Sequence, residues 1–573
     1  MNLIPYGIMN YAELIQEGRY FIDKTQYIAD LEPIKNPVFL RPRRFGKSLF
    51  CSMLQYYYDI HEAGRFSELF GQTWIGKNPT SQHNSYIVLK FDFSAIPISD
   101  NLKDIEKNFH RYCNERIIGT KIETNTHSIK TIPLSPYDNA ATNLSIWLNQ
   151  LRSAQYPQVY VIIDEYDNFV NQLITTYKEH LYREITSGDS FFRTFFKVIK
   201  EGRQTGSVAN VFITGVLPIT IDDLTSSYNI AKFLTLSPKF EHMLGFTQNE
   251  VNSLVDKIFH DYHIEPQYRE EINEIIKSQY NGYHFVSTEG DSLYNPTMLM
   301  YFLDLFCEGR KIPIDLIDLN LRTDLSWVKR ITGKNPKSTE EFIQELTVDE
   351  TIQYNRTLLL SKFNMNQFFE RNFYPISFFY LGMLTKHDDF RLKLPNLSMR
   401  TIMVEYFNEL NQIDITTDYG TVMEEFTAHP ELEPLFSRFW ELYISRLPEA
   451  VFQKVNENFY RTTFYSFCTQ TLFRFFTWNI ERSYPQGRSD LEFVGKFHER
   501  FAGIRWIIEF KYYSNTECSK MKCSPKEFTY DPKDAEQIRG YAEGLKMEYP
   551  ETKVQLFVIY CFGNQGFRIF EIE

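Results

Sequence analysis

The sequence has 573 residues, a length that calls for three or four domains rather than one. Apolar residues make up 43% of it and charged residues 23%, as in ordinary globular proteins, and 50 Phe and 37 Tyr supply material for large cores. The net charge of −12 argues against a generally basic nucleic-acid-binding protein.

The apolar runs, the start of the chain and the cysteines all favour an intracellular protein. No apolar run approaches the roughly 18 residues that a membrane-spanning helix needs. Residues 1–5 lack the charged stretch and apolar segment of a secretory signal. The seven Cys are scattered and odd in number, which is typical of reduced thiols. We therefore predict a cytoplasmic protein without a membrane partner.

A strand, a loop and a helix follow a short N-terminal docking segment. Residues 38–40 are an apolar run that predicts a buried strand, and from Phe50 onward apolar residues recur with helical spacing. Between them lies Gly46-Lys47-Ser48, the end of a phosphate-binding loop, where a helix N-terminus offers N–H groups to an anion. We expect Lys47 to reach the β- and γ-phosphates of ATP and Ser48 to hold Mg²⁺.

The loop departs from the full phosphate-loop pattern at its first position. That pattern begins with Gly, which permits a tight turn, whereas this sequence has Arg41. The motif therefore predicts nucleotide binding and leaves the loop shape and ATP hydrolysis open. Arg43 and Arg44 add positive charge to the predicted cofactor site, and the alternative is that they are solvated surface residues.

A second landmark follows a continuous β-branched and aromatic run at residues 159–163, which is typical of a central parallel strand. The run ends at Asp164 and Glu165, at the edge where open α/β sheets bind ligands. We predict that Asp164 holds the Mg²⁺ of bound ATP, directly or through water. Glu165 is the predicted general base for the attacking water. The alternative is an ordinary turn after a strand.

Two more strands are predicted at residues 85–92 and 208–213. The later strand ends at Thr214, a candidate sensor of the γ-phosphate whose alternative role is structural. A Phe-rich amphipathic helix precedes that strand. Strands and helices thus alternate through residues 1–235, which predicts a parallel sheet covered on both faces.

The middle of the chain reads as helical. A capping box opens a helix at Thr247, and Asn295-Pro296 opens another. A hairpin signal at residues 385–394 lies between two helices and suggests a winged-helix-like module. We assign residues 236–345 to a helical lid region and residues 346–445 to a helical, winged-helix-like linker region. We expect the helix, hairpin and helix at residues 378–412 to relay nucleotide state to the C-terminal domain.

Residues 446–573 contain a second, separate group of candidate catalytic residues. One predicted strand begins at Asp490, and a later one contains Glu509 and Lys511. Residues two apart in a strand share a face, so Glu509 and Lys511 point the same way, and Asp490 can meet Glu509 across the ladder. Two carboxylates and an ammonium predict a Mg²⁺ site in which Lys511 positions a water. The alternative is a cross-strand salt-bridged cluster.

Motifs along most of the chain resemble those of bacterial AAA-ATPase-like proteins that end in a PD-(D/E)XK nuclease-superfamily domain. In the N-terminal part they are YFIDKT, RPRRFGKS, KFDFS, IIDEYD, FITGV, LSPKFEHMLGFTQNEV and YNGYHF. In the C-terminal part they are GRSDLEF, IIEFK and AEQIRGYAEGL. The resemblance implies a P-loop NTPase-like parallel sheet, a helical middle and a restriction-endonuclease-like α/β domain. It also implies Asp490, Glu509 and Lys511 as catalytic residues, with Glu457 as a leading acid and Gln537 as a following polar residue.

Together these features predict an ATP-binding, ATP-hydrolysing protein coupled to a nuclease that uses Mg²⁺, with Mn²⁺ as the alternative metal. Acidic and basic residues nearly balance from Val451 onward, which permits binding of a nucleic acid. DNA is favoured over RNA, with defence or mobile-element biology as the setting, and a homo-oligomer is left open. The alternative function is a nucleotide-dependent switch whose C-terminal domain binds a nucleic acid or a partner without cleaving it.

Overall fold

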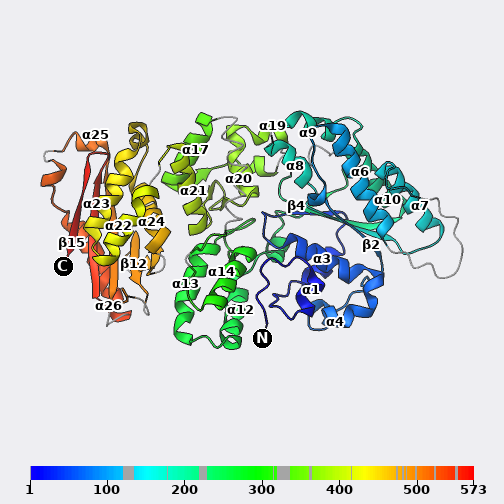
Figure 1. Ribbon diagram of the computed structural model, residues 1–573, viewed down its shortest axis with the longest axis horizontal. Helices are drawn as coiled ribbons and strands as arrows, with labels where there is room; N and C mark the ends of the chain where they lie inside the picture. Colours follow the sequence, from blue (N-terminus) through cyan, green and yellow to red (C-terminus); the bar gives the residue numbers. More distant parts are fainter. Residues whose placement is uncertain are drawn as a thin grey trace.

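The computed structural model describes residues 2–120, 134–176, 178–218, 229–313, 315–318, 336–360, 364–413, 416–472, 475–480, 483–484, 487–496, 500–521, 524–548 and 553–573. Three groups of elements follow one another along the longest axis: an N-terminal sheet domain, a helical middle and a C-terminal sheet domain (Figure 1). The predicted mixed α/β architecture is confirmed. Among the described helices, none has both the length and the apolarity to cross a bilayer.

A five-stranded sheet organises the N-terminal domain, and all its neighbouring strands are parallel. The strands, in the spatial order β2-β3-β4-β1-β5, are β1 (Pro37–Leu40), β2 (Ile87–Asp92), β3 (Val159–Asp164), β4 (Val208–Gly215) and β5 (Lys232–Phe233). Every residue of β3 is buried, because helices cover both faces of the sheet, and this explains its unbroken apolar run. The predicted central parallel strand is therefore confirmed.

Helices lie on both faces of this sheet (Figure 1). On one face α3 contacts β2 and β3, and on the other α6 contacts β2 and α10 contacts β4. The predicted Phe-rich helix is α10, which buries Phe192, Phe195 and Phe196. The helices of this part are α1 (Tyr11–Gln16), α2 (Gln26–Leu31), α3 (Lys47–Tyr58), α4 (Phe66–Phe70), α5 (Trp74–Lys77), α6 (Leu102–Gly119), α7 (Ala140–Ser153), α8 (Asn168–Thr175), α9 (Glu179–Thr186) and α10 (Phe191–Thr205).

The chain then becomes helical, as predicted. The helices α12 (Gln248–Asp261), α13 (Arg269–Tyr280) and α14 (Pro296–Gly309) form the lid region. Thr247 and Glu250 make the predicted capping box of α12, and Asn295 caps α14 with Pro296 as its first residue. These local signals fixed the helix starts because capping depends on residues three apart or fewer.

A small mixed module lies between the lid and the C-terminal domain. It contains α17 (Pro336–Asp349), β6 (Thr351–Gln353), α18 (Arg356–Leu360), α19 (Met365–Phe368), α20 (Tyr374–Tyr380), β7 (Thr385–Lys386), β8 (Arg391–Lys393) and α21 (Leu397–Leu410). The predicted hairpin is formed by β7 and β8. The strand β6 adds to the other side of β8, a pairing that the sequence analysis did not predict. We call residues 336–410 the middle module.

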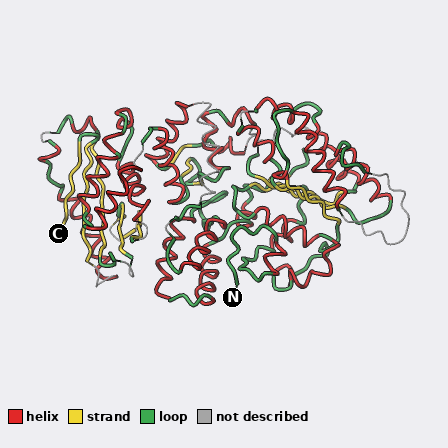
Figure 2. Tube along the Cα trace, viewed as in Figure 1, coloured by secondary structure: helices red, strands yellow, loops and turns green. Residues whose placement is uncertain are grey.

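The C-terminal domain is built on a second five-stranded sheet, which Figure 2 shows separated from the first by helices. Its order is β15-β14-β13-β12-β9, and all neighbours are antiparallel except β13 and β14. The five strands are β9 (Phe476–Ile480), β12 (Leu491–Gly495), β13 (Ile504–Tyr513), β14 (Lys553–Phe562) and β15 (Gly566–Ile572). The short strands β10 (Ser483–Tyr484) and β11 (Gly487–Arg488) pair with each other in a separate two-stranded sheet. The helices are α22 (Thr416–Ala428), α23 (Leu432–Leu442), α24 (Glu457–Leu472), α25 (Asn515–Cys518) and α26 (Pro532–Glu548).

Two helices assigned to the linker by the sequence analysis lie on this sheet. Phe426 of α22 packs edge-on against Trp506 of β13, with ring centroids 5.9 Å apart. Phe436 of α23 contacts Phe567 of β15 at 5.0 Å. The helical layer on this face of the sheet thus includes residues that precede the predicted boundary at 446.

Candidate functional site

The predicted phosphate loop connects β1 to α3. Gly46 precedes the first residue of α3 with φ of +89°, in the left-handed region that favours glycine. Arg44 also lies in that region, with φ of +69°. The turn directs the free N–H groups of the first turn of α3 into the loop, where they can bind an anion.

Lys47 is the cation of this loop. Its side chain is 3% exposed, Nζ donates a hydrogen bond to the Pro42 carbonyl oxygen at 3.0 Å, and Nζ lies 3.6 Å from Glu165 Oε1. A bound phosphate would compete with these two partners for Nζ. The structure therefore brings Lys47 and Glu165 together at this loop.

Arg41 stands where the phosphate-loop pattern has Gly, and its side chain makes contacts within the protein core. Its guanidinium lies between the Phe39 and Phe285 rings, 4.3 and 4.4 Å from their centroids. It donates to the carbonyl oxygens of Leu40 and Thr235. Burial lowers the pKa of Arg41 to about 9, against the opposite effect of Glu241. Arg41 thus joins the loop to the lid region.

Asp164 ends β3 beside the start of α3. Burial, and then the charge of Glu165, raise its pKa to about 6, while Ser48 and Lys47 act in the opposite direction. Its Oδ2 is buried and has no hydrogen-bond partner. A carboxylate oxygen without a partner beside a hydroxyl is a donor set that fits Mg²⁺. Asp164 and Ser48 are therefore the residues that could hold the metal of a nucleotide.

Three further predicted residues have identifiable neighbours. Thr214 donates its hydroxyl to the Phe39 carbonyl oxygen at 2.8 Å, so that hydroxyl links β4 to β1. Arg43 lines a small cavity with Glu165. The Arg44 side chain lies 3.9 Å from Asp318, and its carbonyl oxygen accepts a hydrogen bond from Thr297. These contacts connect the loop to β4 and to the lid region.

Asp167 was missed in the sequence analysis and is a structural residue of this site. Burial and the charge of Glu165 raise its pKa to about 6, while the Leu217 N–H, which it accepts at 2.8 Å, lowers it. Asn171 Nδ2 donates to the same oxygen, Oδ2, at 2.6 Å. The sequence motifs could have indicated Asp167, because it ends the IIDEYD motif and Gly215 lies in FITGV.

Gly215 is required by this contact. A Cβ there would lie 2.3 Å from Asp167 Oδ1 and 2.6 Å from the Tyr166 ring. We expect Gly215→Ala to lower the free energy of unfolding by about 1–3 kcal/mol, because buried atoms must move apart. Gly64→Ala is the matched control, since a Cβ there meets nothing within 4 Å. Urea denaturation followed by circular dichroism measures both, and equal midpoints would contradict the prediction.

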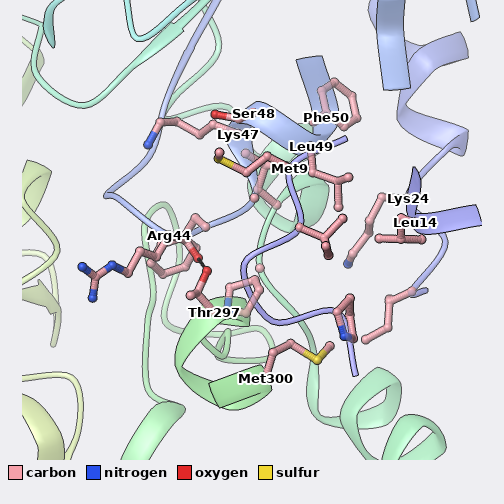
Figure 3. A pocket seen from close by; sticks show the side chains of 18 of the residues that line it. Met9, Leu14, Lys24, Arg44, Lys47, Ser48, Leu49, Phe50, Thr297 and Met300 are labelled. Carbon is pink, nitrogen blue, oxygen red and sulfur yellow. Dashed lines mark hydrogen bonds between the residues drawn. The ribbon is translucent and has the colours of Figure 1, made fainter. Parts of the chain in front are cut away.

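A cavity of about 340 Å³ adjoins the loop. Lys47 and Ser48 line it (Figure 3), and Glu165 lines it as well. Lys24 also borders it, and its ammonium is held by Glu250 at 2.6 Å. The apolar lining comes from the N-terminal segment, from α3 and from the lid region: Ile8, Met9, Leu14, Ile22, Leu49, Phe50, Met53, Met243, Leu244, Phe246 and Met300.

A second site lies on the C-terminal sheet. The antiparallel register of β12 and β13 places Asp490 beside Glu509, and Asp490 Oδ2 accepts the Phe510 N–H at 2.8 Å. Lys511 Nζ donates to Glu509 Oε1 at 3.0 Å. Phe510 is fully buried in the opposite face, against Phe436. The structure therefore brings together the three residues that strand alternation predicted.

Glu509 is the central acid of this site. Burial, and then the charge of Asp490, raise its pKa to about 8, against the effect of Lys511. Its Oε1 accepts hydrogen bonds from Lys511 and from Gln537, the latter at 2.9 Å, whereas the buried Oε2 has no partner. In the part of the chain that the structure describes, no three His, Cys, Asp or Glu side chains enclose a metal position. A Mg²⁺ here would take two carboxylates and draw its other ligands from water and phosphate.

Glu457 stands at the start of α24 on the side of these acids. Burial, then the charge of Asp490, raise its pKa to about 7, while Lys511 and Arg461 oppose the shift. The pKa of Lys511 is raised: burial would lower it, but Glu509 and Glu457 act more strongly in the other direction. The two predicted accessory residues, Glu457 and Gln537, thus both belong to the same cluster.

Two neighbours of this cluster were not predicted from the sequence. Tyr541 accepts a hydrogen bond from Gln537 at 2.6 Å, and a Cβ at Gly487 would lie 3.1 Å from its hydroxyl. Arg461 Nη1 lies 3.4 Å from Asp490 Oδ1. Helical spacing could have indicated both, because Tyr541 is four residues after Gln537 and Arg461 four after Glu457.

Two family models match separate regions of this chain. Residues 5–225 match a family model described as a predicted AAA-ATPase. Residues 455–571 match a model of the PD-(D/E)XK nuclease superfamily. The first match includes the phosphate loop and Asp164, and the second includes all three residues of the C-terminal cluster.

A curated relative extends along nearly the whole chain. It is a protein of Azotobacter chroococcum mcd 1, described as an uncharacterized protein in the vnfD 5′ region. It is 24% identical over 588 residues, which cover 98% of this chain and 99% of that protein. The similarity therefore extends over both of the regions that the family models match.

Proposed function

We propose that this chain, which joins an AAA-ATPase-like domain to a PD-(D/E)XK nuclease-superfamily domain, is an ATPase that controls a metal-dependent nuclease. The observation that carries the proposal is the difference in hydrogen bonding between the two carboxylate oxygens of Glu509. One of its oxygens is held by Lys511 and Gln537, and the other is buried without a partner. Such an oxygen suits a divalent metal ion, whose binding would satisfy it.

At the first site, Lys47 would leave the Pro42 carbonyl oxygen and contact the β- and γ-phosphates of ATP. Ser48 and Asp164 would hold Mg²⁺, which when bound neutralises phosphate charge. Glu165 faces the same pocket and would orient the attacking water. The apolar part of the cavity would take the base and ribose, since ligand pockets combine apolar walls with a few polar groups.

At the second site, Asp490 and Glu509 would hold the metal ion, which when bound activates water and stabilises charge on the phosphate. Gln537 fixes the Glu509 carboxylate, and Lys511 would position the nucleophile at the scissile phosphate. DNA of a phage or mobile element is the proposed substrate. Plasmid DNA and RNA of equal length, incubated with Mg²⁺ or Mn²⁺ and with or without ATP, test substrate and coupling together. Lack of cleavage under all conditions would contradict the proposal.

The middle module supplies a physical connection between the sites. Gly382, after α20, lies so close to the phosphate loop that a Cβ there would be 2.6 Å from Pro42. At the start of α21, Asn396 donates to the Asn281 carbonyl oxygen of the lid region at 2.9 Å. Contacts alone do not establish coupling, so ATP-dependence of cleavage is the measurement that decides it.

A switch without nuclease activity is the second candidate. Both carboxylate oxygens of Asp490 already have partners, Arg461 for Oδ1 and the Phe510 N–H for Oδ2. This arrangement favours a domain whose Asp490 carboxylate stays bound to protein groups rather than to a metal ion. Such a domain would bind a nucleic acid or a protein without cleaving it. ATP-dependent DNA binding without cleavage would support the switch over the nuclease.

Glu165→Gln is expected to keep ATP binding and to slow ATP turnover about 10²–10⁴-fold, because only the general base is removed. Loss of the contact with Lys47 also leaves that cation available to phosphate. Equilibrium binding of a fluorescent ATP analogue and phosphate release measure the two effects. Glu201→Gln, at an exposed position of α10, is the matched control. Unchanged turnover in Glu165→Gln would exclude Glu165 as the base.

A further inference from the structure

A line of alternating charges connects the middle module to the C-terminal acids. Arg400 on α21 lies 2.6 Å from Glu350 Oε2. The other oxygen of Glu350 lies 3.6 Å from Arg461 Nη2, and Arg461 Nη1 lies 3.4 Å from Asp490 Oδ1. The Arg461 side chain is only 3% exposed, and the three others are between 10% and 17% exposed. Two carboxylates from different parts of the chain therefore share one buried guanidinium.

A metal ion and Arg461 would compete for the same oxygen. Asp490 Oδ2 accepts the Phe510 N–H, so Oδ1 is the oxygen that faces the metal position and Arg461. A divalent cation at Oδ1 would lie within a few ångströms of the guanidinium, and two buried positive charges at that distance repel each other strongly. Metal binding is thus favoured only when Arg461 moves from Asp490.

Glu350 is the alternative acceptor for Arg461. It follows α17 and precedes β6, with φ of +56°, and its Oε1 accepts the Thr462 hydroxyl at 2.9 Å. Because β6 pairs with β8, Glu350 is attached to the hairpin of the middle module. The helices α17 and α21 both contact α24, which carries Arg461. The position of the module therefore sets how strongly Glu350 attracts the guanidinium.

We propose that Arg461 is a positioning residue that competes with the metal ion for Asp490, and that the middle module controls this competition through Glu350. The inference rests on the proposed metal-dependent nuclease. With Arg461 on Asp490, the site binds metal weakly. When Glu350 takes the guanidinium, Asp490 Oδ1 becomes available, and the site binds metal and cleaves.

The test is Mn²⁺ binding to the full-length chain, measured by electron paramagnetic resonance without nucleic acid. All proteins carry Asp164→Asn, which removes the metal ligand of the nucleotide site. Arg461→Met, which keeps much of the side-chain bulk without the charge, is expected to bind Mn²⁺ at least tenfold more tightly. Glu350→Gln is expected to bind at least threefold more weakly, because Arg461 then has Asp490 as its stronger partner. The double variant should bind like Arg461→Met, since Glu350 acts through Arg461.

Matched controls separate this role from a general effect of losing a buried charge. Arg438→Met removes a surface arginine of α23 that pairs with Glu425 and should leave Mn²⁺ binding unchanged. Arg461→Lys retains a cation and should not tighten binding as Arg461→Met does. A purely structural role predicts weaker or equal binding in Arg461→Met, and either result would overturn the inference.

The outcomes also distinguish this inference from the proposed function. Asp490→Ala is added both to the Asp164→Asn protein and to its Arg461→Met derivative. If Mn²⁺ binding is unchanged in both, the assignment of the metal site is wrong. If binding depends on Asp490 but does not respond to Arg461→Met, only the competition is wrong. Should Arg461→Met fail to fold by circular dichroism, Glu350→Gln decides alone: weaker binding supports the competition and unchanged binding refutes it.

Discussion

Replacing Asp490 by alanine is expected to abolish nuclease activity while ATP binding stays at the level of the unsubstituted protein. Asp490 and Glu509 are the two carboxylates available to the metal, and loss of one removes several kcal/mol of stabilisation from the transition state. The expected decrease in cleavage rate is therefore about a thousandfold or more. Plasmid cleavage in Mg²⁺ and equilibrium binding of an ATP analogue measure the two properties. Glu433→Ala, on the exposed side of α23, is the matched control.

Lys511 gives an independent check on the same site. Lys511→Ala removes the ammonium 3.0 Å from Glu509 but no proposed metal ligand. Metal binding should therefore persist while the cleavage rate decreases by roughly a hundredfold. A salt-bridged cluster without catalytic function would instead change only stability, by about 3–5 kcal/mol, because the Glu509 carboxylate is buried. Metal-dependent cleavage that survives Asp490→Ala, Glu509→Ala and Lys511→Ala would place the activity elsewhere.

Lys47→Ala is expected to reduce ATP affinity on the order of a hundredfold or more, because it removes the ammonium that would contact the β- and γ-phosphates. A hundredfold change corresponds to about 2.7 kcal/mol, within the range for hydrogen bonds to charged groups. Isothermal titration with Mg²⁺-ATP measures the effect. The buried pair with Glu165 is lost as well, so circular dichroism must show that the variant is folded.

Lys103→Ala, at an exposed position of α6, is the control for this experiment. It removes the same charge from the same domain at a distance from the loop, and ATP affinity should not change. Equal affinities in Lys47→Ala and the unsubstituted protein would rule out the phosphate-loop assignment. The nuclease of Lys47→Ala should also lose any stimulation by ATP, which links this result to the coupling proposed above.

The local parts of the fold were predictable. The strand β3, the capped starts of α12 and α14, and the β7–β8 hairpin follow from periodicity, capping and turn signals that act within a few residues. The grouping of Asp490, Glu509 and Lys511 was also predictable, because the two-residue period of a strand decides which side chains share a face.

Contacts between distant segments were not predictable in the same way. Arg41 departs from the phosphate-loop pattern, and only the structure shows its guanidinium between Phe39 and Phe285. The contact of α22 and α23 with the C-terminal sheet likewise depends on the three-dimensional fold, which decides which helices cover the apolar face of that sheet. Many helices of this chain have an apolar face, so periodicity alone does not select the partner.

The main strands of the first sheet, the phosphate-loop position and the residue types of both sites follow from short-range spacing in the sequence. The partners of the charged groups depend on the tertiary structure. Asp490 lies between Arg461 and the Phe510 N–H, and Arg461 between Asp490 and Glu350. Such contacts exist only where folding removes the side chains from water and brings remote segments within about 4 Å, since a buried charge must then find a partner.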